Sequence, residues 1–297
     1  MQALTGLFAP RSIEELLSLL AGSGEHEKHF IAGGTDWLIK NRRNISEDAV
    51  LFDLSKIPEL RGIENRGSYL RLGSMETMTS IHTDPEIRLH AAALCDAASS
   101  MGSVQIRNRA TVGGNLANAS PAADTPGALA ALNASAVIFS PSGTKELSIE
   151  EVLGTCPNKN TLSDSDIIME FRIPVRKSHV SAFKKIGSRS EVSIARINLA
   201  VSAKYEDGAF CDAMVFVGTL GTAAKRSPEA ENALLMPISL RKEGFKKALC
   251  EFAGRMIPSR STLPYKQSAI QALAEDVLEM LEARGRSLEK SGEKSHG

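Results

Sequence analysis

The stretch FIAGGTDWLIK, residues 30–40, places two adjacent glycines and two small polar residues where a short apolar strand is expected to end. A second stretch, ATVGGNLANASPAAD at residues 110–124, repeats this pattern further along the chain. Adjacent glycines can take positive φ and let a bulky ligand come close to the backbone. Successive N–H groups can then converge on one anion. Two such loops facing each other would suit a diphosphate without any lysine.

Neither stretch matches an established nucleotide motif, because both the GxGxxG and the GxxxxGK[ST] spacings are absent. Taken alone, either double glycine is more typical of a tight turn than of a ligand loop, so both interpretations stay open at this point. Ser120 and Asp124 add oxygen ligands after the second pair. Asp124 could equally cap the short helix predicted at residues 125–134.

The composition is that of an ordinary globular chain of two or three domains. The 297 residues are 42% apolar and 24% charged, and the formal net charge is zero. No basic excess indicates nucleic-acid binding, and neither a membrane span nor a signal peptide is predicted. The four cysteines (Cys95, Cys156, Cys211 and Cys250) form no CxxC pair, so we expect no metal or iron–sulfur site and a cytoplasmic location.

The apolar periodicity predicts an α+β fold rather than a doubly wound parallel sheet, because strands and helices alternate irregularly. Helices are predicted at residues 12–20, 85–102, 125–134 and 263–285, the first with Ser12 and Glu15 as a capping box. Strands are predicted at residues 29–32, 49–55, 69–74 and 166–174, with a hairpin at 136–149. Three antiparallel strands should follow a charged connector, the last two joined by Asp207-Gly208. Residues 286–297 are polar and predicted to be disordered.

Two motifs resemble those of a known family. AGGTD at residues 32–36, followed by QIRNRATVGGNLANASPAADTPGALAAL at 105–132, resembles the FAD-binding medium subunits of the molybdenum hydroxylases, of the xanthine dehydrogenase and carbon monoxide dehydrogenase type. The resemblance continues through residues 166–174 and 181–201 into the closing helical region, so it covers nearly the whole chain.

The resemblance implies a domain organisation as well as a fold. Residues 1–176 would form a FAD-binding domain like that of vanillyl-alcohol oxidase (PCMH type), with subdomains at about 1–55 and 56–176. A C-terminal α+β domain with a three-stranded antiparallel sheet and helices would span residues 177–286. Residues 287–297 would be a polar tail.

The resemblance also implies which residues bind FAD. The diphosphate would lie over both glycine loops, formed by Ile31, Ala32, Gly33, Gly34, Thr35, Asp36 and Trp37 and by Thr111, Gly113, Gly114 and Asn115. Ser120 and Asp124 would serve ribityl or ribose hydroxyls. Ile168 would pack against the isoalloxazine, and Lys184 would lie at its polar edge. Met101 stands where some relatives place an aromatic residue on the flavin, and the cysteines of relatives with an additional iron–sulfur cluster are missing.

The function implied is electron transfer, with no residue acting as a general base. A molybdopterin-binding large subunit would hydroxylate the substrate, and a [2Fe–2S] small subunit would pass electrons to the FAD of this chain. The acceptor would be a soluble molecule such as NAD. In the loop at residues 187–196, Arg189 or Glu191 is a candidate contact for a nicotinamide nucleotide. The alternatives are a stand-alone flavin-dependent oxidoreductase, for which no base is evident, and a cofactor-free scaffold subunit, which the intact glycine loops disfavour. Histidines such as His29 are interpreted as surface or structural residues.

Overall fold

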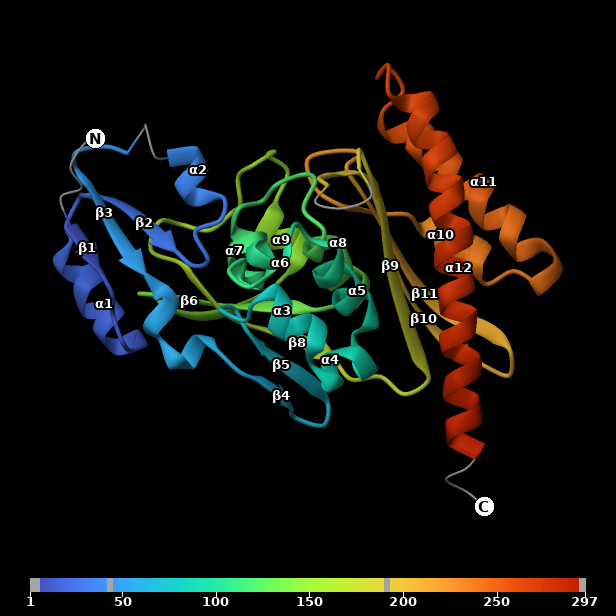
Figure 1. Ribbon diagram of the computed structural model, residues 1–297, viewed down its shortest axis with the longest axis horizontal. Helices are drawn as coiled ribbons and strands as arrows, with labels where there is room; N and C mark the ends of the chain where they lie inside the picture. The colour runs from blue at the N-terminus through green and yellow to red at the C-terminus, as the bar shows by residue number, and fades with distance from the viewer. Residues whose placement is uncertain (1–5, 42–44, 190–192, 294–297) are drawn as a thin grey trace.

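The computed structural model describes residues 6–41, 45–189 and 193–293, and they form three sheets arranged in a row (Figure 1). The first sheet is parallel, in the order β1-β3-β2, and the other two are antiparallel, in the orders β4-β5-β8-β6-β7 and β12-β11-β10-β9. The mixed helix and sheet architecture confirms the predicted α+β class.

The first sheet, at the N-terminal end, positions the first glycine loop. Its strands are β1 (Gly6–Phe8), β2 (Glu27–Ile31) and β3 (Ala49–Asp53). Helix α1 (Ile13–Gly22) covers it with its apolar face, and the Ser12 hydroxyl accepts the first-turn N–H of Glu15, as the capping motif predicts. The glycine loop leaves β2 and ends in α2 (Trp37–Asn41).

The middle sheet carries a layer of short helices that hold the second motif. Its strands are β4 (Ile63–Asn65), β5 (Tyr69–Gly73), β6 (Ser135–Ser140), β7 (Gly143–Ser148) and β8 (Ile167–Pro174). The helices are α3 (Met78–Thr83), α4 (Pro85–His90), α5 (Ala92–Ser100), α6 (Val104–Arg107), α7 (Val112–Ala117), α8 (Thr125–Ala131) and α9 (Ile149–Leu153). The helix predicted at 85–102 is therefore two helices, since Ala91 leaves helical geometry at φ −138°.

The third sheet is buried on both faces. Its strands are β9 (His179–Gly187), β10 (Ala195–Glu206), β11 (Ala209–Gly218) and β12 (Lys225–Arg226). In β10, Ile197, Leu199 and Val201 pack under the C-terminal helices, while Ala200 packs with the helices of the middle layer. This period of two is what a strand between two layers requires. Three strands were expected, and the two-residue β12 makes a fourth; the predicted Asp207-Gly208 turn is present, with φ 51° and 75°.

Helices α10 (Pro228–Leu234), α11 (Ile238–Met256) and α12 (Leu263–Glu293) cover the outer face of this sheet (Figure 1). The expected disorder from residue 286 is wrong up to Glu293, because α12 continues that far; residues 294–297 lie outside the described part. Leu288 still packs against the core, and the Glu289 carboxylate accepts the N–H of Gly208 in the β10–β11 turn at 3.1 Å. None of the described helices is long and apolar enough to cross a membrane.

Candidate cofactor site

The two glycine loops pack directly against each other. A Cβ on Gly33 would lie 2.0 Å from the carbonyl oxygen of Arg109, and one on Gly114 would lie 3.4 Å from the Ala32 Cβ. Of the four glycines in these two loops, only Gly34 has positive φ, at 74°. Gly113 and Gly114 belong to helix α7 instead of a strained turn, and a Cβ on Gly113 would lie 2.7 Å from the Ser74 Cβ. The glycines therefore serve mainly close packing, and positive φ is needed at one of them only.

The first loop presents backbone donors, and the second does not. The N–H groups of residues 33–36 have no hydrogen-bond acceptor among the described residues. In the second loop, the N–H of Gly113 donates to Ser74 O at 2.8 Å and that of Gly114 to Thr111 Oγ1 at 3.2 Å. The expectation of two facing nests is thus corrected to one row of free donors, backed by the second loop.

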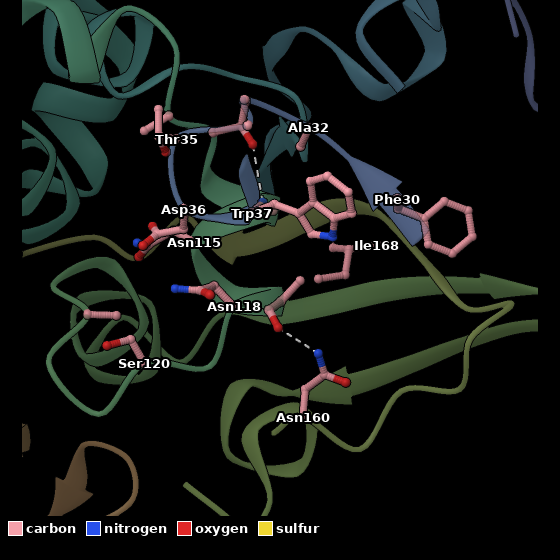
Figure 2. A pocket seen from close by; sticks show the side chains of 18 of the residues that line it. Phe30, Ala32, Thr35, Asp36, Trp37, Asn115, Asn118, Ser120, Asn160 and Ile168 are labelled. Atoms are coloured by element: carbon pink, nitrogen blue, oxygen red, sulfur yellow. Dashed lines mark hydrogen bonds between the residues drawn. The ribbon is translucent and has the colours of Figure 1, made fainter. Parts of the chain in front are cut away.

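A cavity of about 640 Å³ lies where the loops meet, a volume typical of small-molecule sites. Of the residues implied by the resemblance, those that line it are Ala32, Gly33, Gly34, Thr35, Asp36, Trp37, Met101, Thr111, Gly113, Gly114, Asn115, Ser120, Asp124 and Ile168. Figure 2 shows side chains from both loops and from Ile168 of β8 around this space. Ile31 and Lys184 are not in the lining.

Lys185, rather than Lys184, reaches the cofactor cavity. Adjacent residues of a strand point to opposite sides, and Lys184 is exposed while the Lys185 side chain is only 10% exposed. Lys185 pairs across the strands with Asn198, and both side chains bind the Asp124 carboxylate: Lys185 Nζ donates to Oδ2, and Asn198 Nδ2 donates to Oδ1 at 3.4 Å. Asp124 makes no capping bond to α8.

Asp124 is a buried carboxylate at the boundary between the middle layer and the third sheet. Asp124 is 4% exposed, and this burial raises the pKa of its carboxyl group. The charge and hydrogen bond of Lys185 and the hydrogen bond of Asn198 act in the opposite direction and lower the pKa. Residues from two separate parts of the chain therefore complete one charged corner of the cavity.

Amide side chains form a second polar group in the lining. Thr125 Oγ1 donates to Asn115 Oδ1 at 2.6 Å, Lys40 Nζ donates to Asn118 Oδ1 at 2.6 Å, and Asn160 Nδ2 donates to Ala117 O at 2.6 Å. Asn118 stands inside the second motif and could have been chosen from it. Lys40 and Asn160 carry no local signal in the sequence.

The apolar part of the lining includes Phe30, Trp37 and Met101. His29 also lines the cavity, and its ring meets that of Trp37 edge to face with centroids 5.4 Å apart. The interpretation of this histidine as a surface or structural residue stays a prediction. Glu191 lies outside the described residues. Arg189 lies at a separate cavity.

This arrangement fits FAD. A row of free N–H groups suits a diphosphate, carboxylate and amide groups suit sugar and ribityl hydroxyls, and the apolar walls suit flat rings. Such a site can hold and electrostatically tune a cofactor that supplies the redox chemistry.

Comparisons with known proteins agree with this fit. Residues 3–176 match the family model described as the FAD binding domain in molybdopterin dehydrogenase. The chain is 31% identical over 285 residues to the nicotinate dehydrogenase FAD-subunit of Eubacterium barkeri, covering 93% of this chain and 96% of the relative. It is 30% identical to the xanthine dehydrogenase FAD-binding subunit of Escherichia coli O157:H7, covering 94% and 96%.

The fold is that of a solved dehydrogenase. Carbon monoxide dehydrogenase from Hydrogenophaga pseudoflava superposes with a TM-score of 0.84 at 23% identity, covering 96% of this chain and 99% of that one. The sequence match, the similar relatives and the shared fold all point the same way. The chain belongs to the family of FAD-binding subunits of molybdopterin dehydrogenases, which are oxidoreductases.

Proposed function

We propose that this chain is the electron-transfer subunit of a molybdenum hydroxylase, standing between the [2Fe–2S] clusters of a small subunit and an external acceptor such as NAD. A large subunit with the molybdopterin cofactor would hydroxylate the substrate. The relatives' names support this organisation, since they are FAD-subunits or medium chains of dehydrogenases.

The observation that carries the proposal is the run of N–H groups at residues 33–36 that have no acceptor among the described residues, in a loop that lines one cavity and packs against the second glycine loop. These donors would hold the diphosphate of FAD. Thr35 adds a hydroxyl, and Asp36 would accept from a hydroxyl because a carboxylate repels phosphate. Asn115 would donate through its amide nitrogen, since Thr125 occupies its oxygen.

Lys185 supports the redox role. It carries a cation into the cavity and is held there by Asp124. A fixed cation beside the flavin would favour its reduced form and so raise its reduction potential. The side-chain placement supports assigning this role to Lys185 instead of Lys184.

Gly33 provides the direct test of cofactor binding. Gly33→Ala would push the two loops apart, since its methyl would meet the Arg109 carbonyl. Overpacking of this kind costs about 1–3 kcal/mol, so FAD should bind about ten-fold or more weakly. The measurement is a fluorescence titration of the apoprotein with FAD, with circular dichroism to confirm folding. Gly22→Ala is the matched control, because its methyl would have nothing within 4 Å.

Activity assays then separate the functions. The proposal predicts a yellow protein that passes electrons from NADH to a dye and hydroxylates nothing until both partner subunits are added. A protein that stays colourless with excess FAD would contradict the proposal in favour of a scaffold. Turnover of an organic substrate by the isolated chain would instead support a stand-alone oxidoreductase.

A further inference from the structure

Asn198 is a buried amide that lies directly behind the charged corner of the cofactor cavity. It belongs to β10 and is 1% exposed, and it does not line the cavity itself. A polar side chain buried to this degree needs hydrogen-bond partners inside the protein. The partners of Asn198 therefore indicate what its side chain does.

Both partners of the amide nitrogen are acceptors. Asn198 Nδ2 donates to Asp124 Oδ1 and to the carbonyl oxygen of Ala123, each at 3.4 Å. Only the NH₂ group of the amide can face two such oxygens, because the amide oxygen has no proton to donate. The other end of the amide is tightly packed, since a Cβ on Gly218 would lie 2.1 Å from Asn198 Oδ1. The amide is therefore fixed with its donor toward the carboxylate.

The carboxylate that accepts this bond has a single charged partner. Lys185 Nζ donates to Asp124 Oδ2 and Asn198 donates to Oδ1, so each oxygen has its own donor. Among the described residues, Lys185 of β9 is the only charged side chain that affects the pKa of Asp124, and α8 itself carries none. Asn198 thus adds a donor without adding a charge, and the ion pair stays neutral overall.

We propose that Asn198 is a positioning residue for the flavin, which holds the Asp124 carboxylate against Lys185 and so keeps that ammonium paired and fixed in the cavity. The inference rests on the proposed electron-transfer function, in which Lys185 tunes the flavin. Without the amide donor, Asp124 takes up a proton at a higher pH. The Lys185 ammonium then has no counter-charge, and an uncompensated cation in the cavity favours the reduced flavin.

The dependence of the flavin midpoint potential on pH tests this role, by spectroelectrochemistry on the FAD-loaded chain. Asn198→Leu removes the donor. Loss of a hydrogen bond to a charged group should raise the pH at which Asp124 takes up its proton by about one to two. Between the transitions of wild type and variant, the potential of the variant should be higher by about 30 mV, a ten-fold change in the redox equilibrium. Above this range the two potentials should coincide.

Asn198→Asp should give the opposite sign. It keeps the shape of the side chain, so it also tests the role if Asn198→Leu does not fold. At high pH two carboxylates then face one ammonium, and the potential should fall below that of wild type by about 30 mV. At lower pH the two carboxylates share a proton, which restores the charge of wild type, and the two potentials should converge.

Ser202→Ala is the matched control, because Ser202 is buried on the same face of β10, at 5% exposed, and does not line the cofactor cavity. Potentials that follow wild type at every pH in both Asn198 variants would overturn the inference. Shifts of the same sign in both variants, or an equal shift in Ser202→Ala, would overturn it too. In these cases the protein stays yellow and the flavin assignment stands, whereas a colourless wild-type protein would overturn the proposed function as well.

Discussion

Thr125 is fully buried at the first position of α8, and its hydroxyl determines which way the Asn115 amide faces. With Asn115 Oδ1 occupied by this hydroxyl, the NH₂ group is the part left for a ligand in the cavity. Thr125→Val keeps the shape of the side chain and removes that bond, whereas Thr125→Ser keeps the bond.

We expect Thr125→Val to weaken FAD binding about ten-fold, because a lost hydrogen bond to a buried partner costs about 1–3 kcal/mol. Thr125→Ser should restore most of the affinity. The measurement is the flavin fluorescence titration, together with the near-ultraviolet circular dichroism of the bound flavin. Equal loss in both variants would point to packing instead of amide orientation.

Among the described residues, three lysines line the cavity, Lys28, Lys40 and Lys185; the Lys185 side chain is only 10% exposed, and its ammonium is held by Asp124. Lys185→Met should lower the two-electron midpoint potential of the bound flavin by about 30 mV, which corresponds to about 1.4 kcal/mol. Spectroelectrochemistry on the FAD-loaded chain measures this shift. Lys177→Met should leave the potential unchanged, and a larger shift in Lys184→Met would return the role to Lys184.

At the residue scale, the sequence could not decide which of two adjacent lysines faces the cavity, because the phase of a strand determines it. The glycines, Asn115 and Asp124 stand in a continuous motif, so their neighbourhood was visible in the sequence, and the structure places them around one cavity. Lys184 and Lys185 are adjacent, and a shift of one residue in strand phase exchanges the sides to which they point. That phase is set by Phe183 and by pairing with β10, which local sequence does not reveal.

At the scale of elements, Gly285 lets α12 lie directly on the third sheet. A Cβ there would be 2.4 Å from the Tyr205 ring of β10. Alanine favours helix by about 1 kcal/mol over glycine, yet overpacking costs about 1–3 kcal/mol. We therefore expect Gly285→Ala to be neutral to about 2 kcal/mol destabilising. Gly254→Ala in α11, whose methyl would lie no closer than 3.4 Å to its neighbours, should stabilise the protein.

Urea unfolding of both variants compares the two glycines. Stabilisation of similar size in both would show that α12 can move off Tyr205 at no cost. The same contact region explains why the helix was predicted too short. The sequence beyond residue 286 is polar, and the packing of Leu288 and the bond from the Gly208 N–H to Glu289 are contacts with distant residues that local sequence does not reveal.

At the scale of the whole molecule, Asp96 and Arg284 join parts of the chain that are 188 residues apart. The guanidinium binds both oxygens of the carboxylate, which also accepts the N–H of Phe183 at 3.1 Å. Helix α5 of the middle layer, strand β9 and helix α12 thus meet at one ion pair, whose side chains are 20% and 32% exposed.

A double-mutant cycle with Asp96→Ala and Arg284→Met should give a coupling energy of about 1 kcal/mol in urea unfolding. The value allows for partial solvent screening of a bidentate pair. The cycle at Glu229 and Arg255, whose side chains are 54% and 50% exposed, is the control and should give a value near zero. Equal coupling energies in both cycles would contradict the conclusion that the Asp96–Arg284 ion pair stabilises the contact between α5, β9 and α12 more than an exposed surface pair does.

The sequence predicted the elements better than their assembly. Most strands and capped helices follow from apolar periodicity and turn residues, so they were recognisable locally. The stacking of three sheets depends on what covers each face of β10. Its apolar face packs under the C-terminal helices, but Asn198 and Ser202 on the opposite, more polar face are also buried, and the alternation alone would have placed that face in solvent. The domain boundaries proposed from the resemblance remain a prediction.

Asp124 comes from the middle layer, and Lys185 and Asn198 come from the third sheet. Any breathing motion that parts these layers would hydrate the carboxylate and release its cation. The absorption spectrum and the reduction potential of the bound flavin would then report how closely the middle layer and the third sheet are packed. A partner subunit that binds both layers on their outer surface would therefore change the reduction potential of the flavin without contacting it.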